Sequence, residues 1–112
     1  MISQVGYNKK TVTVDHREFL VQIVPFANGD FISVTEGRES IGTLVVSISS
    51  GGRTSTATVI PSKSETIFLK MVSERVASTI NGICIFSLYI KKELDLESMK
   101  ALMNEIMEII KQ

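Results

Sequence analysis

The sequence is poor in the residues from which metal sites, disulfides and many catalytic sites are built. Its 112 residues include one cysteine, one histidine and no tryptophan. A single cysteine, Cys84, excludes a disulfide within the chain, and together with one histidine it leaves little for a zinc site. No group of residues offers both a nucleophile and a base. We therefore expect no catalytic residues, no metal and no cofactor.

The chain also lacks net charge and long apolar runs. Twelve basic and 12 acidic residues cancel, so no excess of positive charge favours nucleic acid or an anionic membrane as a partner. No apolar run reaches the roughly 18 residues of a membrane-spanning helix. The first ten residues lack the apolar segment of a signal peptide. With no disulfide possible, we expect a reducing compartment, the cytoplasm or also the nucleus.

The hydrophobic residues, 44% of the chain, predict one globular domain over residues 1–112. Its first half reads as β-structure, because short apolar or alternating runs are separated by polar turns. Short connections between neighbouring strands favour an antiparallel meander. The strands are expected at Thr11–Val14, Phe19–Phe26, Phe31–Thr35, Gly42–Ser49 and Ser55–Ile60.

In the second half the apolar period changes to that of helices. The Ser-x-x-Glu pattern at Ser62–Glu65 fits a capping box, so a helix is predicted to begin there. Asn81-Gly82 suits its left-handed C-terminal cap. A strand is expected at Ile83–Ile90, followed by a last helix that Asp95 caps.

The strand Ile83–Ile90 is apolar on both of its faces, which predicts a central position in the sheet. Two helices about 10 Å wide cover one face of six strands spaced about 4.8 Å apart. The predicted fold is therefore α+β: a six-stranded, mostly antiparallel sheet with two helices on one face. A partner subunit is expected on the other face, and a folded-over hairpin of the first strands is the alternative. The candidate dimer face consists of Ile83, Ile85, Ser87 and Tyr89, although the sequence leaves open whether this face or that of Phe86 and Leu88 is the interface.

The stretch "SISSGGRTST" has the composition of a phosphate-binding loop but not its spacing. It lacks the Gly-x-x-x-x-Gly-Lys pattern and leads into a strand rather than a helix. It is predicted to be a mobile hairpin loop, which either binds a partner or only connects two strands. The candidate partner-binding residues are Ser49, Ser50, Gly51, Gly52, Arg53 and Thr54.

Three further features have ordinary structural explanations. His16 lies in a polar turn and is expected to be solvated, and Cys84 lies in an apolar strand and is expected to be an inert, buried thiol. The stripe Met99, Met103 and Met107 fits core packing, with a partner-binding surface as the alternative.

Together with the element order, stretches such as "IGTLVVSI" and "TATVI" resemble the proteasome assembly chaperone 3 family. "IGTLVVSI" (Ile41–Ile48) is similar to a strand of that family, and "IFSLYIKKELDLESMKALMNEIMEIIK" (Ile85–Lys111) resembles its apolar strand, charged turn and closing helix. "TATVI" and the helix "IFLKMVSERVAS" fall where the family has its fifth strand and first helix.

This resemblance implies a non-catalytic chaperone that binds proteasome α subunits as a dimer while the α-ring of the 20S proteasome assembles. The implied partner is a subunit similar to proteasome assembly chaperone 4, or a second copy of this chain. The family's loop between the fourth and fifth strands corresponds to "SSGGRTSTAT". The alternative is a generic dimeric α/β scaffold or adaptor for another complex, similar to roadblock or longin modules, although roadblock domains begin with a helix. A small-molecule enzyme is a third class, which the missing catalytic residues disfavour.

Overall fold

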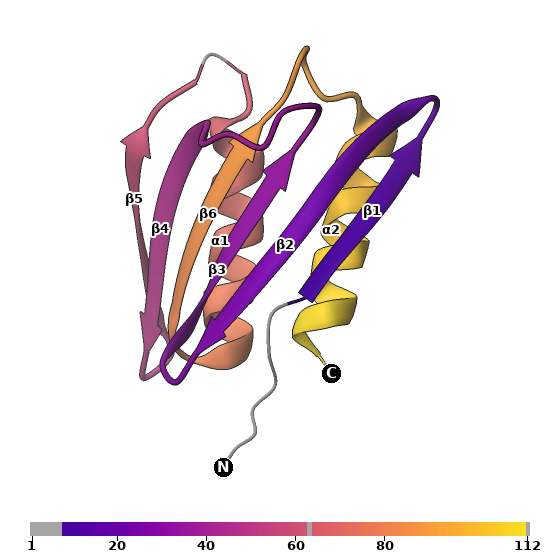
Figure 1. The fold of residues 1–112 in the computed structure, drawn as a ribbon. Coiled ribbons are helices and arrows are strands. Elements are labelled where there is room, and N and C mark those ends of the chain that lie inside the picture. The colour runs from indigo at the N-terminus through magenta and orange to yellow at the C-terminus, as the bar shows by residue number, and fades with distance from the viewer. Residues whose placement is uncertain (1–7, 63, 112) are drawn as a thin grey trace.

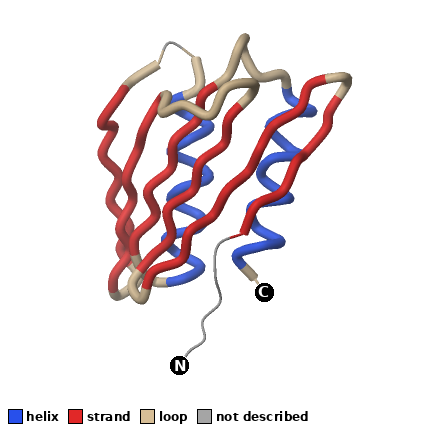
Figure 2. The backbone as a smooth tube through the Cα atoms, viewed as in Figure 1, coloured by secondary structure: helices blue, strands red, loops and turns tan. Residues whose placement is uncertain are grey.

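The computed structural model describes residues 8–62 and 64–111, and it confirms the α+β class (Figures 1 and 2). Residues 1–7, which make up most of the N-terminal stretch that lacks the apolar segment of a signal peptide, lie outside the described residues. So does position 63 of the predicted capping box. Along the chain the elements are β1 (Asn8–Val14), β2 (Arg17–Phe26), β3 (Gly29–Thr35), β4 (Thr43–Ser50), β5 (Arg53–Ile60), α1 (Thr66–Ile80), β6 (Ile83–Tyr89) and α2 (Leu96–Ile110).

The six strands form one sheet in the order β1-β2-β3-β6-β4-β5. The predicted meander is right for β1–β2–β3 and for β4–β5, but wrong between β3 and β4, where β6 is inserted. β6 pairs parallel with β3 and antiparallel with β4. An interior position suits β6 because, on both faces of the sheet, the side chains of two neighbouring strands shield its apolar side chains from water. Its predicted central position is therefore confirmed.

Both helices lie on one face of the sheet, where α1 packs against β4, β6 and β5, and α2 packs against β1 (Figure 1). We call this the covered face. It carries the strand residues of the core, which are at most 2% exposed: Phe19, Val21, Ile23, Ile32, Val34, Val45, Cys84, Phe86 and Leu88. Phe68 of α1 meets Phe86 edge-on, with 6.4 Å between ring centroids, which is a favourable aromatic geometry.

The β4–β5 connection is shorter than the sequence indicated. Only Gly51 and Gly52 lie outside the strands, with φ of 59° and 82°. Two successive positive φ values are typical of a type I′ turn, whose twist matches that of the paired strands. The predicted six-residue mobile loop is therefore wrong as secondary structure: Ser49 and Ser50 belong to β4, and Arg53 and Thr54 belong to β5.

The helix ends agree with the sequence in two of three places. Asp95 caps α2, accepting a 2.7 Å hydrogen bond from the backbone N–H of Ser98. Asn81 ends α1 in the left-handed conformation. α1, however, begins at Thr66 after Glu65, whose side chain makes no capping bond. The hydroxyl of Ser62 instead accepts from the Glu65 N–H at 3.1 Å, one turn before the helix.

Candidate functional site: an open apolar sheet face

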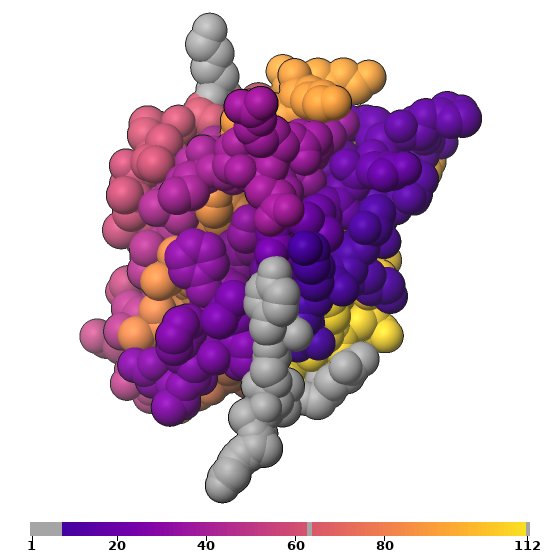
Figure 3. Space-filling model, in the orientation of Figure 1, coloured from indigo at the N-terminus to yellow at the C-terminus, as the bar shows by residue number. Residues whose placement is uncertain are grey.

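The face of the sheet opposite the helices carries no helix among the described residues. The β3–β4 connection reaches over one end of it, where the Gly42 N–H donates to Ser87 and Thr35 and Ser87 are 1% exposed, and the rest is uncovered. The first strands lie in the sheet itself, so the alternative of a hairpin folded over this face is wrong. We call it the open face, and Figure 3 views the molecule from this side. Strand pairing places eleven large apolar or aromatic side chains on it: Leu20, Val24, Phe26, Phe31, Leu44, Val46, Ile48, Ile60, Ile83, Ile85 and Tyr89.

Several of these side chains are exposed to a degree that is unusual for their type. Phe26 is 64% exposed, Ile48 49% and Ile60 43%. Towards the centre of the sheet, Phe31, Ile85 and Val46 lie side by side across β3, β6 and β4 and are half-buried. A contiguous apolar area of this kind marks an interaction site on a folded protein.

A hollow of about 220 Å³ lies at the end of the open face near the β2–β3 turn. It is lined by Phe26, Phe31, Ile83 and Ile85, together with residues 28–30. Gly29 faces the open side, and a Cβ there would lie 2.2 Å from the backbone oxygen of Ile83. The missing side chain lets β3 approach β6 and leaves a depression between aromatic walls.

All four residues of the candidate dimer face lie on the open face, but they differ in exposure. Ile83 and Ile85 are half-buried and Tyr89 is 38% exposed. Ser87 is only 1% exposed, and its hydroxyl accepts a 3.2 Å hydrogen bond from the Gly42 N–H. Ser87 therefore serves the packing of this chain. The set that contains Phe86 and Leu88 lies buried under the helices, so the set on the open face is the one accessible to a partner.

The candidate loop residues lie at the tip of the β4–β5 hairpin, next to the end of the open face that is near the β2–β3 turn. Ile48 of β4 pairs with Ile83 of β6. Ser49 is buried and accepts a 3.1 Å hydrogen bond from the hydroxyl of Thr54. Arg53 is exposed, and a Cβ at Gly51 or Gly52 would meet nothing within 4 Å. The hairpin tip thus projects freely from the sheet.

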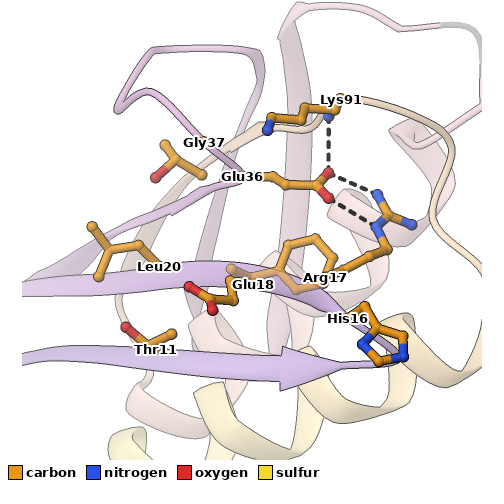
Figure 4. Close-up of a pocket in the computed structure, with 10 residues that line it drawn as sticks. Thr11, His16, Arg17, Glu18, Leu20, Glu36, Gly37 and Lys91 are labelled. Atoms are coloured by element: carbon orange, nitrogen blue, oxygen red, sulfur yellow. Dashed lines mark hydrogen bonds and ion pairs between the residues drawn. The ribbon is translucent and has the colours of Figure 1, made fainter.

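At the opposite end of the sheet, a buried ion pair joins β2 to the end of β3 (Figure 4). Arg17 Nε and Nη2 donate to the two carboxylate oxygens of Glu36 at 2.9 and 2.8 Å, and both side chains are less than 10% exposed. Arg17 also donates to the backbone oxygens of Lys92 and Glu93, and its guanidinium lies 5.0 Å from the Phe19 ring centroid. Hydrogen bonding to Arg17 is the main cause that lowers the pKa of Glu36, and the Lys91 N–H, at 2.9 Å, lowers it further.

The Arg17–Glu36 pair borders an open hollow of about 420 Å³ that also contacts Thr11, His16, Glu18 and Lys91. Because its two buried charges bond to each other and to backbone, neither is available to a ligand. His16 lies in the exposed β1–β2 turn with a φ of 68°. The cluster therefore works as a clamp that holds β2, β3 and the β6–α2 connection together.

The remaining candidate residues from the sequence are Cys84 and the three methionines of α2. Burial, and to a lesser extent the charge of Asp30, raises the pKa of Cys84 to about 12, so the thiol is protonated and unreactive at neutral pH. Among the described residues no three His, Cys, Asp or Glu side chains gather closely enough to hold a metal ion. Neither described helix is long and apolar enough to span a membrane. Met107 is buried, and Met99 and Met103 pack partly buried against the core.

Comparison with known proteins gives a structural likeness only. No protein-family model matches the chain, and no curated protein does. The fold matches a chain in the crystal structure of a novel chaperone complex for yeast 20S proteasome assembly, with a TM-score of 0.64 and 12% sequence identity. The match covers 94% of this chain and 97% of that one. This fold is similar to that of a proteasome assembly chaperone. At this identity the likeness establishes the architecture.

The sequence located the part of the open face on β6 and missed the contributions of β3 and β4. Phe31 and Ile48 join it only because β6 lies between their strands. The sequence also indicates the part on β2, since Leu20, Val24 and Phe26 give that strand a second apolar face opposite Phe19, Val21 and Ile23.

Proposed function

We propose that this protein is a non-catalytic chaperone subunit that promotes assembly of the 20S proteasome. The observation that carries the proposal is an uncovered apolar sheet face on a fold similar, over 94% of the chain, to a chain of a proteasome assembly chaperone complex. Its site of action is the cytoplasm, or also the nucleus.

The open face is the dimer interface in this proposal. The exposed side chains Phe26, Ile48 and Tyr89 surround half-buried ones, an arrangement that another apolar surface would dehydrate. Burying apolar area contributes about 25 cal/mol per Å². The partner is a subunit of the same fold, similar to proteasome assembly chaperone 4, or a second copy of this chain.

The dimer binds proteasome α subunits while the α-ring assembles. The β4–β5 hairpin tip contributes to that contact through Arg53, an exposed guanidinium able to form paired bonds to a carboxylate. The generic scaffold or adaptor is the alternative function, because an apolar sheet face serves any subunit assembly equally well.

The interface is tested by adding the same charge to two exposed isoleucines on opposite sides of the molecule. Ile48 lies on the open face and is 49% exposed, whereas Ile67 lies on α1 and is 81% exposed. Ile48→Glu is expected to abolish dimerisation in sedimentation and native mass spectrometry, and Ile67→Glu to leave it intact. If both variants dimerise like the unmodified protein, the open face is not the interface. If the unmodified protein is a folded monomer and no partner is recovered from cells, the dimer is wrong.

The proposed binding of proteasome α subunits is tested by affinity purification of the protein from source cells. Recovery of proteasome α subunits without mature β subunits is expected, and Arg53→Ala is expected to reduce that recovery. Recovery of a different complex favours the adaptor alternative. Unchanged recovery with Arg53→Ala would make the hairpin tip a connection only.

A further inference from the structure

The strand β5 is an outer edge of the sheet, and its free side is not paired within the described residues (Figure 2). It pairs with β4 alone, through an antiparallel ladder that is regular from Arg53 to Thr58. A register shift opposite Leu44 and Val45 interrupts the ladder only beyond that point. A straight segment with free backbone groups is what an added strand requires.

The hairpin geometry indicates which backbone groups of β5 point outward. A two-residue turn is closed by a hydrogen-bonded pair, here Ser50 and Arg53, and bonded and non-bonded pairs then alternate. Thr54, Thr56 and Thr58 occupy the non-bonded positions. Their N–H and C=O groups therefore face away from β4, towards the free edge.

The two edges of the sheet are protected to different degrees. The β1 edge carries Lys9 and Lys10, and Lys10 forms a 2.8 Å ion pair with Glu105 of α2. Lysines are a common means by which proteins discourage strand addition at an edge. From Thr54 to Ile60 β5 contains no charged residue and no proline, and most of its side chains are exposed. Of the two edges, as far as the described residues show, β5 is the one open to strand addition along its length.

We propose that the β5 edge binds an extended segment of another polypeptide by antiparallel strand addition. At one end of the edge, the Arg53 side chain makes no ion pair or hydrogen bond with the described residues, and it suits an acidic residue near the C-terminal end of the added segment. At the other end, Val59 and Ile60 are 55% and 43% exposed and suit apolar residues near its N-terminal end. The threonines between them pair best with β-branched residues. The occupant is therefore a short, β-branched segment that is apolar at its start and acidic at its end.

The test uses a fluorescent, acetylated peptide of the sequence Val-Ile-Thr-Val-Thr-Val-Asp and follows binding by anisotropy. Two matched control peptides have the same side chains but carry N-methyl groups on every second backbone nitrogen. One is methylated on the odd-numbered residues and the other on the even-numbered residues. The alternation that blocks the N–H groups facing β5 is expected to weaken binding by at least about tenfold, since several hydrogen bonds of about 1 kcal/mol each are lost. Equal binding of the parent and both methylated peptides, or no binding by any of them, would overturn the proposal.

Amide hydrogen exchange identifies the bound edge. At saturating peptide, the amides of Thr54, Thr56 and Thr58 are expected to exchange at least about tenfold more slowly. Thr11 and Thr13 are internal references, because β1 also pairs across a two-residue hairpin turn, with β2, and places these threonines at its own non-bonded positions. Protection at Thr11 and Thr13 instead would contradict the proposal, as would protection confined to the open-face strands β3 and β6.

A charge exchange tests the orientation of the added strand. Arg53→Glu is expected to weaken binding of the peptide that ends in aspartate and to strengthen binding of a peptide that ends in lysine. A change in folding would not produce these opposite effects. No change in either affinity would overturn antiparallel binding next to Arg53. Because the readouts are peptide affinity and exchange at β5, their outcome is independent of dimerisation through the open face.

Discussion

The covered face and the open face belong to the same strands but have different surroundings. On β6, Phe86 is fully buried beneath α1, whereas its neighbour Ile85 on the opposite face is half-buried without any helix above it. On β2 the same contrast separates Ile23, 2% exposed, from Phe26, 64% exposed. The alternation of side chains along a strand thus determines which of them share a face, and the number of helices determines how many faces of the sheet are covered. An apolar face that no helix covers is available for a partner.

The strongest test of this contrast truncates adjacent residues of β6. Phe86→Ala is expected to lower the free energy of unfolding by about 3–5 kcal/mol, because it leaves a cavity against Phe68. Ile85→Ala removes a half-buried side chain and is expected to cost less than half as much in the monomer. Urea titrations at low protein concentration measure both. Equal losses would show that the two faces are equally buried in solution.

A second prediction concerns the clamp at the end of the sheet. Glu36→Gln keeps the shape of the side chain but leaves the buried Arg17 charge unpaired, and we expect it to lower the free energy of unfolding by about 3 kcal/mol. Glu39→Gln is the control, because Glu39 is exposed. Chemical denaturation compares the two variants. Similar small losses in both would mean that the ion pair adds nothing to stability.

The same pair predicts a pH dependence of smaller amplitude. Arg17 lowers the pKa of Glu36 below its ordinary value of 4.5, so the stabilisation is present above pH 4.5 and is lost as pH falls through the folded-state pKa. The difference in unfolding free energy between the unmodified protein and Glu36→Gln should therefore shrink below that pH. Asp30 and Asp95 remain in both proteins, so their titrations cancel. A difference that stays constant down to pH 2 would contradict the assignment.

The smallest change in stability is expected from a substitution on the open face itself. Ile48→Thr replaces an exposed residue by a smaller, more polar one that is also β-branched, and it should change the unfolding free energy of the monomer by less than about 0.5 kcal/mol. Binding of a hydrophobic dye should nevertheless fall. A large loss of monomer stability would mean that Ile48 is buried within its own chain.

Much of the fold follows from local patterns in the sequence. All eight elements were predicted in the observed order, and the Asp95 and Asn81 caps were correct because they depend on neighbouring residues. The doubly apolar pattern of Ile83–Ile90 also indicated a central strand, which strand order confirms.

The wrong predictions concern features that depend on residues far apart in the sequence. The insertion of β6 between β3 and β4 reflects competition among strands for the sheet interior, which turn lengths do not encode. The Arg17–Glu36 clamp joins side chains 19 positions apart and ends on backbone oxygens 75 and 76 positions away. The paired glycines predict a long loop where the structure has a tight turn, because their composition suits a mobile segment as well as a tight turn.

The insertion of β6 also has a consequence for how the molecule folds. The hairpins β1–β2–β3 and β4–β5 are built from local contacts, but they share no hydrogen-bonded strand until β6 enters between them. Loop closure over the segment from β3 to β6 must therefore precede formation of the complete sheet, which slows folding relative to a simple meander. We expect mutations in β6 to slow folding, and mutations at the two outer strands mainly to speed unfolding. Until β6 is in place, the chain consists of two separate half-sheets with exposed inner edges, which is the period in which it is most prone to aggregate.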